Sequence, residues 1–144
     1  MNTFSSLLNY VQGRQPGEAQ ASARSDFPNR FCRSRLKLRK PDSRIPVTGD
    51  RFIIGVASYS PEELSLLDQL EKSLNNGTSG AIEVEVFDVL NCSNPKDFEK
   101  YIPGIDGVYR TPLIGVIHDG QLVARATGLE EVVETLRHYK VLNC

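Results

Sequence analysis

Hydrophobic and polar positions along the chain predict four strands. Residues 51–57 form a short apolar run typical of a buried strand. Residues 82–89 begin with strict alternation, which is typical of a strand with one solvated side. The stretch 108–128 predicts a strand, a type I′ turn at Asp119-Gly120 and a returning strand, because both central residues of that turn need positive φ.

Helix-start signals separate these strands. Ser60 is a predicted N-cap, Pro61 occupies the first helical position and Glu63 closes a capping box. We expect this helix to run to about residue 74. Its predicted buried face consists of Leu64, Leu67, Leu70 and Leu74.

Two further helices complete the pattern. A second capping box at residues 127–130 predicts the last helix, and Asn94-Pro95 opens a short one. The last helix is expected to bury Leu129, Val132, Val133 and Leu136. A right-handed crossover makes the first two strands parallel and the hairpin makes the last two antiparallel. The sequence therefore predicts an α/β fold, with a mixed four-stranded sheet flanked by helices.

The charge distribution divides the chain into two expected units. Residues 1–50 carry nine Lys/Arg and four Asp/Glu, whereas residues 51–144 carry eight and fourteen. This asymmetry predicts a basic, largely irregular N-terminal arm on an acidic domain. Within the arm, residues 2–12 match a short amphipathic helix that needs a surface to dock on, and residues 13–30 have linker composition. The apolar positions of that short helix are Phe4, Leu7, Leu8 and Val11.

Residues 31–40 alternate between basic and less polar positions. One interpretation is an edge strand that packs through Leu36 and Leu38 and is protected by a solvated basic face. The other is an arm that docks on an acidic partner, either phosphate or an acidic protein surface. The basic residues predicted to bind that partner are Arg33, Arg35, Lys37, Arg39 and Lys40.

The three cysteines, Cys32, Cys92 and Cys144, lie far apart in the sequence. They form no CxxC pair, metal-ligand cluster or disulfide framework, so we expect reduced thiols, no metal and no cofactor. This cysteine usage favours the cytoplasm. The alternative is an organelle stroma, because residues 12–40 contain Arg and Ser and few acids, as transit peptides do. No apolar run approaches the roughly 20 residues of a membrane helix.

The strand order together with Thr111-Pro112 resembles the thioredoxin-like superfamily over residues 51–140. The resemblance implies a cis proline at Pro112 beside the active site. In redox members, a CxxC pair lies where the first strand meets the first helix. The corresponding residues 57–63 contain no cysteine, so the chain resembles members that lack the motif.

Three segments are most similar to KaiB-type clock proteins and the related kinase sensor domain. These segments are residues 59–63, residues 88–90 and Thr111-Pro112. The closing hairpin and the last helix look more like ordinary thioredoxins. The resemblance implies that partners contact the surface formed by Tyr59, Tyr109, Arg110, Thr111 and Pro112.

These observations favour a non-catalytic protein–protein interaction module, with no catalytic residue predicted. We expect an assembly, linker or regulatory subunit of a larger complex, which docks its basic arm on an acidic partner. One alternative is a thiol–disulfide oxidoreductase that uses Cys32 or Cys92 singly. Another is nucleic-acid binding through the arm, against which the acidic domain argues.

Overall fold

A five-stranded mixed β-sheet forms the centre of the molecule. The computed structural model describes residues 27–31, 35–76, 82–105 and 110–142. The strands lie across the sheet in the order β1-β3-β2-β4-β5. They are β1 (Lys37–Leu38), β2 (Asp50–Val56), β3 (Glu83–Asp88), β4 (Leu113–His118) and β5 (Gln121–Thr127).

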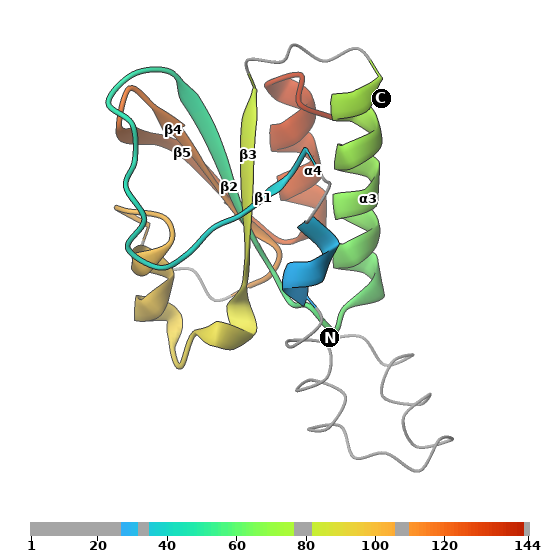
Figure 1. Cartoon of the computed structure of the whole chain (residues 1–144), viewed down its shortest axis with the longest axis horizontal. Helices are drawn as coiled ribbons and strands as arrows, with labels where there is room; N and C mark the ends of the chain where they lie inside the picture. The colour runs from blue at the N-terminus through green and yellow to red at the C-terminus, as the bar shows by residue number, and fades with distance from the viewer. Residues whose placement is uncertain (1–26, 32–34, 77–81, 106–109, 143–144) are drawn as a thin grey trace.

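Helices flank the sheet on both faces. They are η1 (Phe27–Phe31), α3 (Pro61–Asn75), η2 (Val89–Asn91), η3 (Pro95–Lys100) and α4 (Leu129–His138), where η marks a 3-10 helix. The helices α3 and α4 lie side by side on one face (Figure 1). Among the described residues, no helix combines the length and apolar character needed to cross a membrane.

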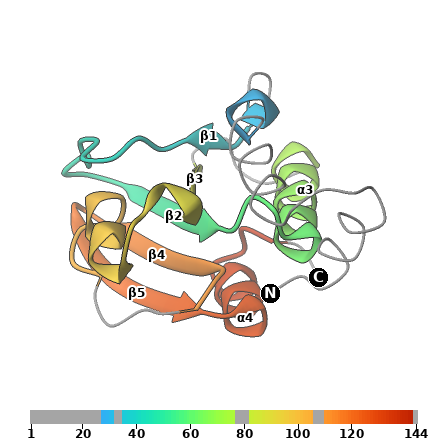
Figure 2. The ribbon, with the colours of Figure 1, turned by 90° about the horizontal axis from the view of Figure 1, so that it is seen from below.

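The strand pairings confirm the predicted α/β fold with a mixed sheet. β2 and β3 are parallel, β4 is antiparallel to β2, and β5 is antiparallel to β4. The prediction of four strands is one short. The additional strand β1 pairs in parallel with β3 at the edge of the sheet (Figure 2), as the edge-strand interpretation of residues 31–40 expected. Leu36 is buried as that interpretation required, but Leu38 is exposed.

Each face of the central strand β2 supports its own apolar core. Phe52 and Ile54 belong to the cluster that α3 and α4 cover, and Ile53 belongs to a second cluster with Phe98 and Ile102 near η3. A strand that is buried on both faces has no polar side to alternate with. This explains the uninterrupted apolar run that identified the strand in the sequence.

Local signals place the first helix and the hairpin as predicted. Ser60 is the N-cap of α3, and its side chain accepts a hydrogen bond from the Glu63 backbone N–H at 3.4 Å. Asp119 and Gly120 have φ of 48° and 84°, which is the type I′ conformation. A short helix after Asn94 is also confirmed, in 3-10 form.

The start of α4 differs from the prediction. Its N-cap is Gly128, with φ of 86° and no side-chain cap, so the expected capping box at residues 127–130 is wrong. Thr127 is instead the last residue of β5, and the Gly128 N–H donates to the Pro112 carbonyl at 2.8 Å. Val132 and Leu136 are buried as predicted, but Leu129 is 41% exposed.

The prediction that Arg39 lies on a solvated basic face is wrong, because Arg39 is buried. β1 ends at Leu38, so the alternation stops before Arg39. The guanidinium of Arg39 donates to Glu85 at 2.7 Å, to the Ser43 carbonyl at 2.8 Å and to the Tyr101 carbonyl. Arg39 thereby joins β1 to β3 and to the segment that follows η3.

Arg35 is also engaged inside the molecule. The side chain is half-buried, and Nη1 donates to the Leu74 carbonyl at 2.9 Å. Leu74 is in the last turn of α3, where carbonyls lack intrahelical partners and a cation is favourable. Of the predicted basic face, Lys37 and Lys40 are exposed, and Arg33 lies outside the described residues.

We expect Arg39→Ala to destabilise the fold. The change leaves two backbone carbonyls and part of Glu85 without their donor, at a loss of about 2–3 kcal/mol in the free energy of unfolding. Urea unfolding measures this loss. Lys37→Ala, at an exposed position in β1 two residues earlier, is the control and should change stability by less than about 0.5 kcal/mol. Equal effects of the two changes would contradict the role given to Arg39.

Candidate functional site

The candidate site lies where the turn between β2 and α3 meets the segment before β4. In the described chain, the peptide bond between Thr111 and Pro112 is cis, as the resemblance implied. One carboxyl oxygen of Glu63 accepts from the Ala57 N–H at 2.8 Å. The other accepts from the Thr111 hydroxyl at 3.1 Å. Glu63 therefore fastens the turn to the cis-proline segment.

This arrangement corrects the capping box predicted at Glu63. In a capping box the side chain bonds to the N-cap N–H, but the Ser60 N–H donates to the Ala57 carbonyl instead. The Glu63 carboxyl reaches Ala57 and Thr111, and only 8% of the residue is exposed. Burial raises the pKa of Glu63 above its usual value of 4.5, although its hydrogen bonds with Ala57 and Thr111 oppose the shift.

A second buried carboxyl group, that of Asp88 in β3, also holds this turn in place. Asp88, at the end of β3, accepts from the Ser58 N–H at 3.3 Å and from the Leu90 N–H at 3.0 Å through Oδ1. Among the described residues, its Oδ2 and the buried hydroxyl of Ser58 have no hydrogen-bond partner. Two carboxyl groups therefore hold the turn that carries Ser58, Tyr59 and Ser60.

The predicted partner-binding residues near this turn differ in exposure. Tyr59 and Thr111 are half-buried, and Arg110 is exposed. The Arg110 guanidinium lies next to Gly128, where an added Cβ would come within 2.9 Å of Nη2. Pro112 is buried, so the exposed surface here is formed by its neighbours, and its contact with a partner stays a prediction. Tyr109 lies outside the described residues.

The structure places the two sets of predicted residues in different parts of the sheet. Lys37 and Lys40 are on β1 and just after it, at one edge. Tyr59 follows β2, and Arg110 and Thr111 precede β4, which is antiparallel to β2, so these residues lie at the same end of the two central strands. A partner that contacts both sets would have to span from the edge of the sheet to its end.

Cys92 is a half-buried thiol that follows η2. It packs against the apolar cluster that contains Phe87 and Phe98. Burial, together with the charges of Asp97 and Asp88, raises the pKa of Cys92 to about 11. Little thiolate is present near neutral pH, so the environment does not activate this cysteine. Cys32 and Cys144 lie outside the described residues.

The sequence contained no clear signal for Glu63 or Asp88 as organisers of the site. Glu63 had a sufficient local explanation in the capping-box pattern. Asp88 lies within the predicted strand 82–89 and was noted only as part of the segment 88–90 that carries the resemblance. Both are explained only by contacts across the fold, with Thr111 and Ser58. Among the described residues, no cluster of His, Cys, Asp or Glu could hold a metal ion.

No family model matches the sequence, and no curated protein matches it. Among solved structures, the chain is similar to the crystal structure of ERdj5 form II, with a TM-score of 0.50 and 15% identity. That match covers 75% of this chain and 14% of the ERdj5 chain. The exposed lipoprotein thioredoxin Etrx1 from Streptococcus pneumoniae strain TIGR4 gives a TM-score of 0.41 and 17% identity, over 62% of this chain and 84% of its own. The chain has a thioredoxin-like fold.

Glu63→Gln should change how stability depends on pH. Between pH 4.5 and the raised pKa of Glu63, the folded protein binds more protons than the unfolded chain, so stability falls as the pH rises. The amide does not titrate, so the variant should gain stability relative to the wild type through this interval. Urea unfolding across the pH range measures the difference. Parallel stability profiles for the two proteins would contradict a raised pKa at Glu63.

Cys92 should react slowly with iodoacetamide in the folded protein. Raising the thiol pKa from 9.0 to about 11 lowers the thiolate fraction about 100-fold at neutral pH. A thiolate of higher pKa is also a stronger nucleophile, which recovers about tenfold in the rate of alkylation. In a Cys32→Ser/Cys144→Ser background, we expect alkylation about tenfold slower than in the same chain unfolded in urea. An equal or faster rate in the folded state would contradict the assignment of Cys92 as an inert thiol.

Proposed function

We propose that this chain is a non-catalytic interaction module with a thioredoxin-like fold, which serves as an assembly, linker or regulatory part of a larger complex. One observation carries the proposal. Residues 57–63, where redox members of the superfamily have their dithiol, contain no cysteine, and Glu63 ties them to Thr111. A position that lacks a thiol and is held by buried hydrogen bonds favours recognition over redox exchange.

The hydroxyl groups of the turn support the same proposal. Ser58 and Ser60 are each 3% exposed, and the Ser60 side chain caps α3. A nucleophile must reach its substrate and have a base within hydrogen-bond distance. Among the described residues, two carboxyl groups lie near the Ser60 hydroxyl, those of Glu62, at 3.5 Å, and Glu63, so it is the burial of both hydroxyls that argues against nucleophilic attack. The turn therefore favours a structural role for both serines.

Two exposed surfaces are available for partner binding. Of the basic residues predicted to bind a partner, Lys37 and Lys40 are exposed in the described part of the arm, and Arg33 belongs to the same arm in the sequence. We expect this arm to dock on an acidic protein surface, because complementary charge steers association. Tyr59 and Arg110 form the second surface, since tyrosine and arginine are enriched at protein interfaces.

The particular similarity to KaiB-type clock proteins also remains a proposal, supported by residues 59–63, residues 88–90 and Thr111-Pro112. A single-cysteine oxidoreductase is the competing function, with Cys32 as its remaining candidate thiol. The raised pKa of Cys92 argues against Cys92 in that role. The cytoplasm, with reduced thiols, is the compartment that fits both functions.

Charge reversal at the basic arm should weaken capture of the partner. In affinity purification of the intact chain from its native source, Lys37→Glu/Lys40→Glu should retain the partner at least tenfold less well at low salt. The wild-type interaction should also weaken as ionic strength rises. The matched control is Lys72→Glu/Lys96→Glu, which reverses two exposed lysines elsewhere. Equal loss with both double variants, or no loss with either, would contradict docking through the arm.

A disulfide-reduction assay with insulin as the substrate separates the two functions. The proposal predicts no turnover above the background rate of the reductant, and no change when the three cysteines are replaced by serine. Turnover that disappears in the Cys32→Ser variant alone would overturn the proposal in favour of the single-cysteine enzyme.

A further inference from the structure

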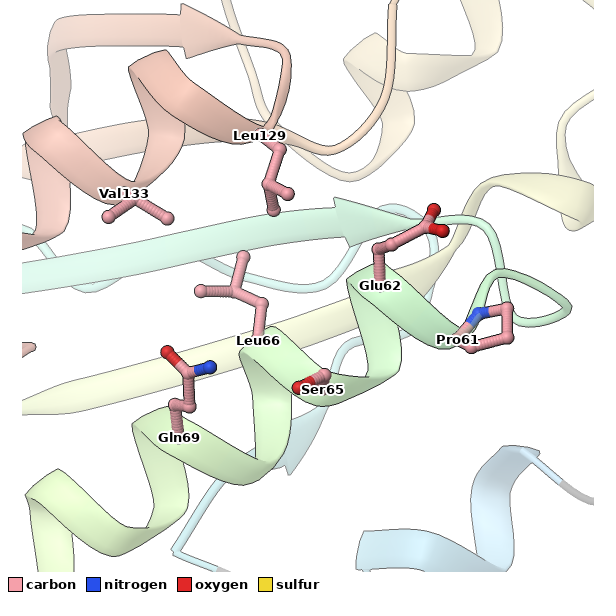
Figure 3. Close-up of a pocket in the computed structure, with 7 residues that line it drawn as sticks. All are labelled: Pro61, Glu62, Ser65, Leu66, Gln69, Leu129 and Val133. Carbon is pink, nitrogen blue, oxygen red and sulfur yellow. The ribbon is translucent and has the colours of Figure 1, made fainter. Parts of the chain in front are cut away.

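A groove between α3 and α4 leaves apolar side chains uncovered. Its volume is about 410 Å³, within the roughly 300–1,000 Å³ of pockets that bury a ligand. Leu66 on α3 faces Leu129 and Val133 on α4 across it (Figure 3). Ser65 and Gln69 form the polar side of the groove on α3. The groove is thus an apolar strip with a polar border.

The spacing of apolar residues in α4 predicts that two residues are buried, but in the structure both are partly exposed to solvent. Leu129 and Val133 continue the stripe of Val132 and Leu136, yet Leu129 is 41% exposed and Val133 is half-buried. An exposed leucine at the border of an apolar groove marks a place where another segment can pack.

The same sequence contains an apolar stripe without an assigned surface. Residues 2–12 have apolar residues at i, i+3, i+4 and i+7 and contain no charged side chain. A helix this short is marginal unless it packs on another surface. An uncharged segment can enter the groove without burying a charge and without repulsion from Glu62 at its border. The four apolar positions are Phe4, Leu7, Leu8 and Val11.

The chain connects this segment to the groove over a short distance. Phe27, where the described chain begins, belongs to the same apolar core as Leu66 and Leu67 of α3. η1 and α4 lie on opposite sides of α3 (Figure 2), and a helix is about 10 Å across. A flexible linker as long as residues 13–26 has an r.m.s. span of about 20 Å. A linker of this length is long enough to pass around α3, so binding of the segment in the groove would be intramolecular.

We propose that residues 2–12 bind as an amphipathic helix in the groove between α3 and α4 of the same chain. Phe4, Leu7, Leu8 and Val11 then cover Leu129 and Val133. The contact is an intramolecular one, and it adds an α-helix beside α3 and α4 on this face of the sheet.

Methyl NMR spectra of the intact chain test this contact. Deleting residues 2–12 should shift the Leu129 and Val133 methyl resonances, and adding a peptide of residues 1–12 should partly reverse the shift. Leu7→Asp should move the resonances toward their positions in the deletion variant. The matched control Ser6→Asp adds the same charge on the opposite side of the stripe and should leave them in place. Val116 methyl resonances in the sheet report that each variant is folded.

Two results would overturn the inference. One is identical Leu129 and Val133 resonances in the intact chain and the deletion variant. The other is a shift that appears only at high protein concentration together with the mass of a dimer, because the segment would then come from a second copy. Resonances that differ between intact and deleted chains at all concentrations, with the mass of a monomer, are the expected result.

Discussion

The buried carboxyl group of Glu63 is the interaction on which the site depends. Glu63 belongs to the first turn of α3, and it bonds to the end of β2 through Ala57 and to the cis-proline segment through Thr111. The turn before α3 and a segment 48 residues further along the chain thereby meet at one side chain. Asp88 supports the same turn from β3 through the Ser58 N–H. Without these two carboxyl groups, the turn would keep only its backbone hydrogen bonds and the Ser60 cap.

A second polar network fixes the edge of the sheet. Glu85 on β3 binds both Arg39, which follows β1, and Arg51 on β2. Arg39 also donates to two backbone carbonyls, so its buried charge is almost fully hydrogen-bonded, as a buried charge must be. Phe27 and Leu36 join the main apolar core from the same side. Part of the sequence expected to form the basic arm is therefore part of the folded body, and Lys37 and Lys40 remain exposed.

The sequence predicted most of the fold because the determining signals are local. The apolar run of β2, the alternation of β3, the Asp119-Gly120 turn and the Ser60 cap each depend on a few adjacent residues. Predictions were wrong where tertiary contacts overrode such patterns. Arg39 continues the alternation of basic residues in the sequence, but its guanidinium is buried and donates to Glu85 on β3 and to two backbone carbonyls. Glu63 fitted a capping box, but Thr111 offered its carboxyl group a partner from another segment. The exposure of Leu129 likewise depends on the spacing of two helices, which sequence periodicity does not encode.

The central claim is that this fold acts through its surface and not through a thiol. Hydrogen–deuterium exchange of the intact chain, alone and bound to its captured partner, tests it most directly. The account predicts slower exchange on binding in residues 35–40 and in residues 59–62 and 110–112, with the partner released by salt and without a reductant. Protection confined to the segment around Cys92, or a complex that dissociates only when a disulfide is reduced, would contradict it.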